Sequence, residues 1–270
     1  MRQLLWQYNN RLQIQRLRRE FRPKVTFCIE KGGYRVKTIE CVRELDQVMR
    51  LRYEVFHREY MNRKFPYGLD SDSFDMVADH LVIIDSANDR IVGTYRLIGS
   101  NYSNDFYSAT EFNIDSFLRL PGNKLELSRA CIHRDFRKGV VMNLLWRGLV
   151  EYIQKIDAHF LFGCSSIKTM DPYDARLVGD YLSEKNQVAQ EFSAHPLPSY
   201  RMDIEAGTPG YSYNREAAKA LIPPLLNSYL RAGAKVITAP ALDRDFRCID
   251  FFTVLNLKDL TQIFERKYTV

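Results

Sequence analysis

Apolar and polar residues alternate in several short stretches of the chain, and this period of two predicts β-strands with one buried face. Residues 25–40 alternate about Gly32 and Gly33, which predicts a hairpin. A second hairpin is predicted over residues 80–99, where a polar turn separates two apolar runs. Further strands are predicted at residues 125–132, 160–166, 235–239 and 249–257.

Helical spacing of apolar residues predicts helices over residues 41–60, 143–157 and 215–232. Residues 61–78 and 195–214 have no consistent period and are expected to be loops. A strand, a helix and a strand follow one another across residues 125–166, which is the order of a right-handed crossover between parallel strands. We therefore expect one α/β or α+β domain over residues 25–270, with a mixed, mainly antiparallel sheet and helices on both faces.

The composition is that of an ordinary globular protein, because 46% of the 270 residues are hydrophobic and 27% are charged. No window is apolar enough to span a membrane, and we expect a cytoplasmic protein. The five cysteines are scattered and never spaced as C-x-x-C, which favours reduced thiols over a disulfide or zinc framework. We expect no metal site and no tightly bound cofactor.

The net charge of +6 arises at the N-terminus. Residues 1–24 hold seven Lys/Arg and one acidic residue, Glu20, and the rest of the chain is balanced. This segment is expected to be a basic amphipathic helix. Two interpretations remain open, namely a solvated helix packed by one face, which we favour, and a helix lying on an anionic membrane surface. A nucleic-acid partner is not expected.

The stretch from Lys124 to Leu145 carries the candidate chemistry. Side chains alternate along a strand, so Glu126 and Ser128 are expected on one face and Arg129 on the other. A carboxylate among apolar strand residues is either a general base or the structural partner of an arginine. The basic turn that follows and the helix start behind it predict an anion site, although a solvated turn would have the same composition.

This strand, turn and helix resemble the acyl-donor motif of the GCN5-related N-acyltransferase (GNAT) superfamily. The family loop has the form Arg/Gln-x-x-Gly-x-Gly/Ala, whereas this chain has Arg137-Lys138-Gly139 and no second glycine. The departure argues against tight binding of coenzyme A. A donor with a single phosphodiester, such as the phosphopantetheine of acyl carrier protein, would need a simpler loop.

A narrower resemblance is to the branch shared by acyl-homoserine-lactone synthases and the ornithine lipid N-acyltransferases, which are often labelled hemolysin-like. Four motifs occur in the branch's order: Leu51-Arg52-x-x-Val55-Phe56, Asp72-x-x-Asp75, Gly93-x-x-Arg96 and Glu126-x-Ser128-Arg129. Segments similar to the ornithine lipid subgroup are Asp79-His80-Leu81, Phe106-Tyr107 before Glu111-Phe112, Leu144-Leu145-Trp146, Leu161-Phe162-Gly163-Cys164 and Asp250-Phe251-Phe252. One departure is Ser128, where that subgroup often has glycine.

The resemblance implies transfer of a long, 3-hydroxylated acyl chain from acyl carrier protein to the α-amino group of an amino acid, with ornithine as the leading acceptor, in lipid biosynthesis. It implies a base at Glu126, assisted by Ser128 and Arg129, and an acceptor site at Asp72, Asp75, Arg52 and Arg96. The donor would meet Cys131, Ile132, Arg134, Arg137, Lys138 and Gly139. The acyl pocket would include Phe106, Trp146 and Phe162.

Two other functions remain open at this point. An acyl-homoserine-lactone synthase would use the same donor chemistry and release a diffusible signal, but the segments after residue 140 do not resemble those enzymes. A non-catalytic membrane-interaction protein is the second alternative. The complete set of Glu126, its arginines and its aspartates argues against that reading, and so does the lack of spanning segments.

Overall fold

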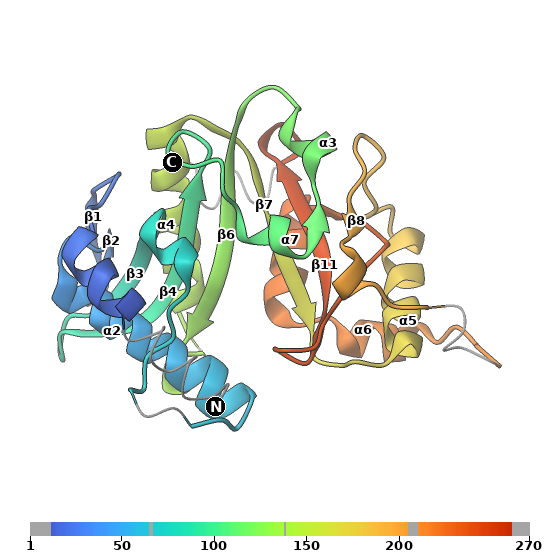
Figure 1. Ribbon diagram of the computed structural model, residues 1–270, viewed down its shortest axis with the longest axis horizontal. Coiled ribbons are helices and arrows are strands. Elements are labelled where there is room, and N and C mark those ends of the chain that lie inside the picture. The colour runs from blue at the N-terminus through green and yellow to red at the C-terminus, as the bar shows by residue number, and fades with distance from the viewer. Residues whose placement is uncertain (1–11, 65–66, 138, 205–209, 261–270) are drawn as a thin grey trace. The chain divides into compact units, whose positions relative to one another are not determined.

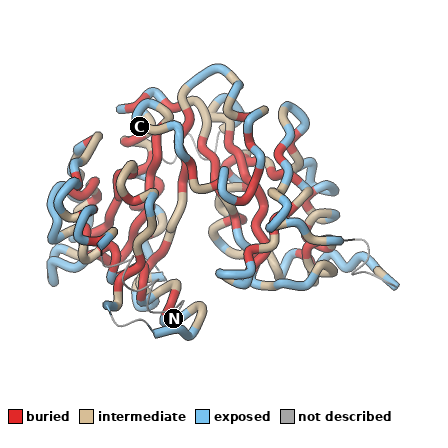
Figure 2. The backbone as a smooth tube through the Cα atoms, viewed as in Figure 1, coloured by how far each residue is buried: buried red, intermediate tan, exposed pale blue. Residues whose placement is uncertain are grey.

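The computed structural model describes residues 12–64, 67–137, 139–204 and 210–260. The chain folds as two compact units. The first comprises Met1–Asp105 and Leu127–Asp157, and the second comprises Phe106–Glu126 and Ala158–Val270. Strand β6 (Asn123–Ile132) gives its first residues to the second unit and its last residues to the first. In both units the buried residues concentrate along the strands (Figure 2).

The first unit contains the two hairpins that the alternating pattern predicts. Its antiparallel strands are β1 (Cys28–Lys31), β2 (Tyr34–Thr38), β3 (Asp79–Asp85) and β4 (Arg90–Gly99), and β6 follows β4 in the sheet. Gly32 and Gly33 have φ angles of 57° and 79°. Two consecutive residues with positive φ form the tight turn that matches the twist of paired strands, and glycine adopts this conformation without strain.

Helices cover both faces of this sheet (Figure 1). On one face, α2 (Val42–Arg52) packs its Val48 and Met49 against Val82 and Ile84 of β3. On the other face lies α4 (Val141–Ile156). A Cβ atom at Gly148 of α4 would lie 2.5 Å from a methyl group of Leu81, so this helix approaches the strands closely because residue 148 lacks a side chain.

The predicted helix over residues 41–60 changes type along its length. It is α-helical to Arg52 and continues as the π-helix η1 (Tyr53–Tyr60). Short π-helical segments are uncommon and occur frequently at functional sites.

The second unit has the strand order β6, β7 (Ala158–Ile167), β11 (Cys248–Asn256) and β10 (Ala241–Asp243). β6 and β7 are parallel, with Glu126 opposite Phe162, which confirms the predicted crossover. β7 and β11 are antiparallel, and the short β9 (Lys235–Val236) also pairs with β11. A separate two-stranded sheet pairs β5 (Phe112–Asn113) with β8 (His195–Pro196).

The helices of the second unit differ from the prediction in two ways. The single helix expected over residues 215–232 is divided into α6 (Arg215–Leu221) and α7 (Pro224–Ala232). Pro223 and Pro224 cause the break, because proline has no N–H for a helical hydrogen bond and clashes with the preceding turn. The sequence analysis also missed α5 (Pro172–Glu184), which packs with α7 in one core cluster.

The remaining short helical segments are η2 (Ser73–Met76), η3 (Tyr107–Thr110), α3 (Asp115–Leu118), η4 (Arg134–Phe136), η5 (Pro198–Tyr200) and η6 (Leu257–Asp259). η2 lies in the loop over residues 61–78, and η4 lies in the basic turn after β6.

The basic N-terminal segment is described only from residue 12, and residues 1–11 lie outside the described part. Residues 12–20 are helical, and Ile14 and Leu17 are buried in the same core cluster as α2. The side chains of Arg16 and Arg19 are exposed. This part of the segment therefore packs by one apolar face. Among the described residues, no helix combines the length and the apolar character that a membrane crossing requires.

Candidate functional site

The predicted motif Asp72-x-x-Asp75 forms the start of helix η2. The side chain of Asp72 accepts a hydrogen bond from the backbone N–H of Phe74 at 2.9 Å, and the side chain of Asp75 accepts one from the backbone N–H of Asp72 at 2.9 Å. This reciprocal capping fixes both carboxylates relative to the backbone. The spacing Asp72-x-x-Asp75 therefore has two explanations, a capping box at the start of η2 and a candidate site.

Arg52, the last residue of α2, binds two of the carboxylates in the following loop. Its Nε donates to Asp70 at 2.6 Å, and its Nη1 donates to Asp75 at 2.6 Å. His57 of the π-helix contacts the other oxygen of Asp70 at 2.9 Å. Burial opposes ionisation of Asp70 and Asp75, but the neighbouring arginines outweigh it and hold both pKa values well below the ordinary range.

Arg96 and Arg129 complete this network from β4 and β6. Arg96 donates through Nε to Ser128 Oγ at 2.9 Å and through Nη1 to Asp72, while Arg129 donates to the other oxygen of Asp72 at 2.9 Å. Ser128 and Arg129 thus both reach the Arg96–Asp72 pair. The expectation that they lie on opposite faces is wrong, because Arg129 has a φ of 49° and leaves the regular strand conformation.

The structure brings together all the predicted acceptor residues, and with them Ser128 and Arg129. Three arginines face three aspartates, so the formal charges within the network cancel. Asp75 and Arg52 are fully enclosed, whereas 25% of the Asp72 side chain and 12% of that of Arg129 remain exposed. Asp72 and Arg129 are therefore the most exposed ion pair of this network among the described residues.

Sequence reasoning missed three members of this network: Asp70, His57 and His80. His80 is fully buried, with its Nε2 3.8 Å from Asp75. Burial lowers its pKa to about 3, with Arg52 and Arg96 acting in the same direction against the charge of Asp75. The repeated acids at positions 70, 72 and 75 were a usable signal for Asp70. His80 lay in the segment Asp79-His80-Leu81 that resembles the ornithine lipid subgroup, but His57 had no signal, because its partner Asp70 comes from another element.

Glu126 lies in the second unit and is completely buried. Its carboxylate accepts hydrogen bonds from the backbone N–H of Tyr107 at 2.8 Å, the N–H of Ser108 at 2.6 Å and the Ser108 hydroxyl at 2.6 Å. Three donors stabilise the ionised form of a buried carboxylate. The residue thus anchors the start of η3 through Ser108, which the sequence analysis did not identify.

The predicted donor residues have different surroundings. Arg137 forms a two-pronged ion pair with Glu59, with Nη2 to Oε2 at 2.7 Å, and its Nε donates to the carbonyl of Ile132. Arg134 is largely exposed. Gly139 has no neighbour that a Cβ atom would meet, and Lys138 lies outside the described residues. Burial raises the pKa of the Cys131 thiol to about 12, which argues against a nucleophilic role for this cysteine.

The predicted acyl-pocket residues are only partly brought together. Phe106 and Phe162 are in edge contact, with ring centroids 5.2 Å apart, and both belong to an aromatic cluster in the second unit. Phe117 of α3 contacts four other phenylalanines of this cluster: Phe160, Phe162, Phe192 and Phe252. Trp146 is buried on α4 in the first unit.

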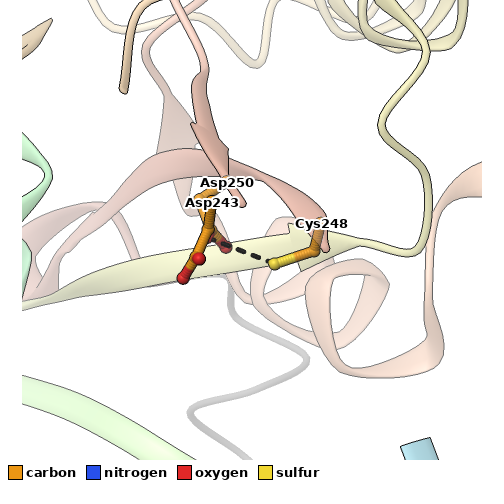
Figure 3. A group of neighbouring side chains, drawn as sticks. All are labelled: Asp243, Cys248 and Asp250. Atoms are coloured by element: carbon orange, nitrogen blue, oxygen red, sulfur yellow. Dashed lines mark hydrogen bonds between the residues drawn. The ribbon is translucent and has the colours of Figure 1, made fainter. Parts of the chain in front are cut away.

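A second group of acids was not predicted. Asp243 of β10 and Cys248 and Asp250 of β11 bring one ligand atom each within 4.8 Å of one another (Figure 3). The Ser166 hydroxyl and the Cys248 thiol both hydrogen-bond Asp250. Burial raises the pKa of Asp250 to about 6, and burial together with Asp250 raises that of Glu111 to about 9. Asp243, Cys248 and Asp250 lie on one hairpin, whereas Glu111 and Ser166 come from distant segments of the chain.

Comparisons of sequence and fold relate the chain to known proteins. A family model described as an acetyltransferase (GNAT) domain matches residues 51–147. An L-ornithine N(alpha)-acyltransferase of Rhizobium meliloti is 34% identical over 230 residues, which cover 79% of this chain and 77% of that protein. Its namesake from Agrobacterium fabrum is 32% identical over 235 residues, which cover 81% of this chain and 79% of that protein.

Among solved structures, FeeM, an N-acyl amino acid synthase from uncultured soil microbes, has a similar fold. The TM-score is 0.50, the sequence identity is 8%, and the alignment covers 85% of this chain and 95% of that one. At this identity the likeness concerns the fold alone.

Proposed function

Since the chain belongs to the family of L-ornithine N(alpha)-acyltransferases, a family of GNAT-like α/β enzymes, we propose that it moves a fatty acyl chain from acyl carrier protein to the α-amino group of ornithine. The membership confirms the predicted family and the class of N-acyltransferase. The donor, the hydroxylated acyl chain and the place in lipid biosynthesis are parts of the proposal. So is a cytoplasmic location.

The observation that carries the proposal is the buried carboxylate of Glu126 on the strand that also holds Ser128 and Arg129. The α-ammonium of an amino acid must lose a proton before its nitrogen can attack a thioester. Glu126 accepts this proton, the new C–N bond forms, and the tetrahedral intermediate then breaks its C–S bond. The phosphopantetheine leaves as a thiolate, which takes up the second proton that the nitrogen loses as it becomes the amide.

The hydrogen bonds of Glu126 determine how its carboxylate can accept the proton. Its two oxygens accept three hydrogen bonds from Tyr107 and Ser108, which fix the orientation in which the carboxylate can meet the amine directly. The Ser108 hydroxyl is the donor that can rotate, because the two backbone N–H groups are fixed by the turn. A water molecule between the amine and Glu126 is the alternative route for the proton.

The arginine and aspartate network supplies the acceptor site. We assign direct contact to Asp72 and Arg129, the aspartate and the arginine of the network with the most exposed side chains. A guanidinium pairs with a carboxylate through two parallel hydrogen bonds, which suits Arg129 to the carboxylate of an amino acid. Arg52, Asp75 and Arg96 are enclosed and act as positioning residues, and Ser128 orients Arg96 through its hydroxyl.

The donor site begins after Glu126 on the same strand. We assign the backbone near Cys131 and Ile132 to the phosphopantetheine arm. Arg134, Lys138 and Gly139 would meet its phosphate and the acidic surface of the carrier protein. Arg137 supports the turn through Glu59.

The acyl chain would lie against the aromatic cluster that contains Phe106 and Phe162. Trp146 is assigned to the core of the first unit instead.

Mass spectrometry of lipid extracts tests the proposal. A bacterial host that lacks such lipids is compared with and without the expressed chain, and the head-group fragments of acylated amino acids are scanned. New N-acylated ornithine is the expected result. Acyl-homoserine lactone in the medium, or neither product despite folded protein, contradicts it.

A further inference from the structure

One ion pair, between Glu59 and Arg137, joins helix η1 to the basic turn after β6. Both terminal nitrogens of the guanidinium donate to the carboxylate, with Nη2 2.7 Å from Oε2. Each of the two side chains is 42% exposed. An exposed ion pair generally contributes little to the stability of a fold. Stability alone is therefore a weak reason for this contact.

Arg137 is held in place independently of Glu59. Its Nε donates to the backbone carbonyl of Ile132, the last residue of β6, at 3.1 Å. This bond orients the guanidinium, so Nη1 and Nη2 face the same side of the turn whichever anion they bind. A guanidinium binds a carboxylate or a phosphate in the same two-pronged geometry. The bound anion can therefore be exchanged without moving the arginine.

Glu59 can leave this arginine without unfolding the helix that carries it. Helix η1 stays attached through His57, whose Nε2 lies 2.9 Å from Asp70. Tyr53 and His57 of the same helix are buried. Displacement of the carboxylate thus requires only rotation about the side-chain bonds of Glu59, because that side chain is partly in contact with solvent.

The charges around the pair suit an anionic ligand. Arg134 lies in the same turn, and its side chain is largely exposed. The hydrogen bond from Arg137 lowers the pKa of Glu59, and the charge of Arg134 acts in the same direction. Glu59 is thus an ionised carboxylate close to both arginines. At Gly139, apart from its chain neighbours, no atom of the described residues lies within 4 Å of the place that a Cβ would take, so the turn is open there.

We propose that Glu59 is an exchangeable counter-ion of Arg137, and that a phosphate ester replaces it there when the acyl donor binds. The inference rests on the proposed function and adds a residue that lies outside the predicted donor motif. A phosphate ester gains its contact with Arg137 only by breaking the contact with Glu59, so the competition weakens the binding of small phosphate ligands. A carrier protein compensates for this loss through the further contacts of its acidic surface.

Titration calorimetry of the purified full-length chain with coenzyme A tests the exchange. Glu59→Gln removes the competing charge and keeps the size of the side chain. The variant should bind coenzyme A about fivefold more tightly than the wild type at low ionic strength, and the gain should shrink at high salt. Glu54→Gln, which changes an exposed acid on the same helix, is the matched control and should leave the affinity unchanged.

Substitution of Arg137 supplies a second comparison. Glu59→Gln should give no gain in affinity in a chain that also carries Arg137→Gln, since the phosphate then has no guanidinium to occupy. A gain that persists without Arg137 would overturn the exchange, because the effect would then be one of net charge. An unchanged or weaker affinity in folded Glu59→Gln would also overturn it and would identify Glu59 as a support for the turn.

Two forms of acyl carrier protein separate the phosphate ester from the acidic protein surface. The holo form carries phosphopantetheine, whereas the apo form has the same surface without it. Glu59→Gln should tighten the binding of the holo form about fivefold and leave that of the apo form unchanged. An equal gain for both forms would contradict the exchange, because it would reflect repulsion between Glu59 and the carrier surface.

These binding measurements need neither ornithine nor acyl transfer. They can fail while ornithine is still acylated, and they can succeed if it is not. A failure of the exchange is thus distinguishable from a failure of the proposed function.

Discussion

The hydroxyl of Ser108 donates to Oε1 of Glu126 at 2.6 Å, next to the Ser108 backbone N–H, which reaches the same oxygen. The candidate base and the turn that follows Phe106 are therefore one structural unit. Glu126 can be a catalytic group, an anchor for η3, or both, and these roles predict different responses to substitution.

Glu126→Gln should keep the fold and lose most acyl transfer, with kcat reduced by about 100-fold or more, since an amide cannot accept the proton. Ser108→Ala removes one hydrogen bond from the carboxylate and leaves the base in place. Activity should then fall much less than in Glu126→Gln. Steady-state kinetics with acyl carrier protein and ornithine measure both. Equal losses in the two variants would identify Glu126 as an anchor only.

Substitutions at Asp72 and at Asp75 should have different effects, one on the binding of ornithine and the other on the stability of the fold. Asp75→Asn leaves Arg52 and Arg96 buried with less compensating charge, so the free energy of unfolding should fall by about 3 kcal/mol. Asp72→Asn affects a partly exposed carboxylate, and its main effect should be a higher KM for ornithine. Urea unfolding and kinetics check the two expectations. A large loss of stability in Asp72→Asn with an unchanged KM would count against its role as an acceptor contact.

The lowered pKa of the buried His80 predicts that the folded protein loses stability in acid. Its folded-state pKa of about 3 lies below the ordinary histidine value of 6.5, so between these pH values the unfolded chain binds a proton that the folded chain does not. The corresponding stability is fully present above about pH 6.5 and is lost as the pH falls towards 3. The depressed pKa values of Asp70 and Asp75 add a further loss below about pH 4.

Urea unfolding between pH 4 and pH 7 measures this dependence, and His80→Gln is the comparison. That variant should have a flatter profile between about pH 4 and 6.5, because it lacks the group that titrates there. A slope identical to that of the wild type would show that His80 does not remain neutral in the folded protein.

The exposed position of Arg134 in the basic turn predicts that the interaction with acyl carrier protein depends on salt. Arg134→Ala should raise the KM for acyl carrier protein several-fold at low ionic strength and have less effect at high salt, because salt screens exposed charges. Arg19→Ala is a matched control, since both side chains are 76% exposed. Equal effects of the two substitutions would indicate a general response to net charge rather than contact at the turn.

Much of the fold follows from local patterns in the sequence. The hairpin about Gly32 and Gly33 requires only that apolar and polar residues alternate along both strands and that two turn residues tolerate positive φ. The break between α6 and α7 could also have been predicted, because Pro223 lacks the N–H that a continuous helix needs. The prediction of one helix there overlooked this residue. The left-handed conformation of Arg129 had no such signal, since arginine seldom adopts it.

The residues of the candidate site also fall into two groups, those that the sequence could predict and those that it could not. Arg52, Asp75, Arg96 and Glu126 were identified from motifs, which record residue types in order. Ser108 and Glu59 were not identified as site residues, because their roles depend on contacts with distant segments. The meeting of Asp250 with Ser166 depends on the register of β7 and β11, which no local pattern specifies.

The central claim is that this chain acylates the α-nitrogen of ornithine. The most direct test incubates the purified full-length chain with 3-hydroxyacyl carrier protein and ornithine, and locates the acyl group by tandem mass spectrometry. The account predicts N-acylornithine with the acyl chain on the α-nitrogen, formed about 100-fold more slowly or less with Glu126→Gln. Acylation of the side-chain nitrogen, or no product from folded wild-type protein, would contradict it.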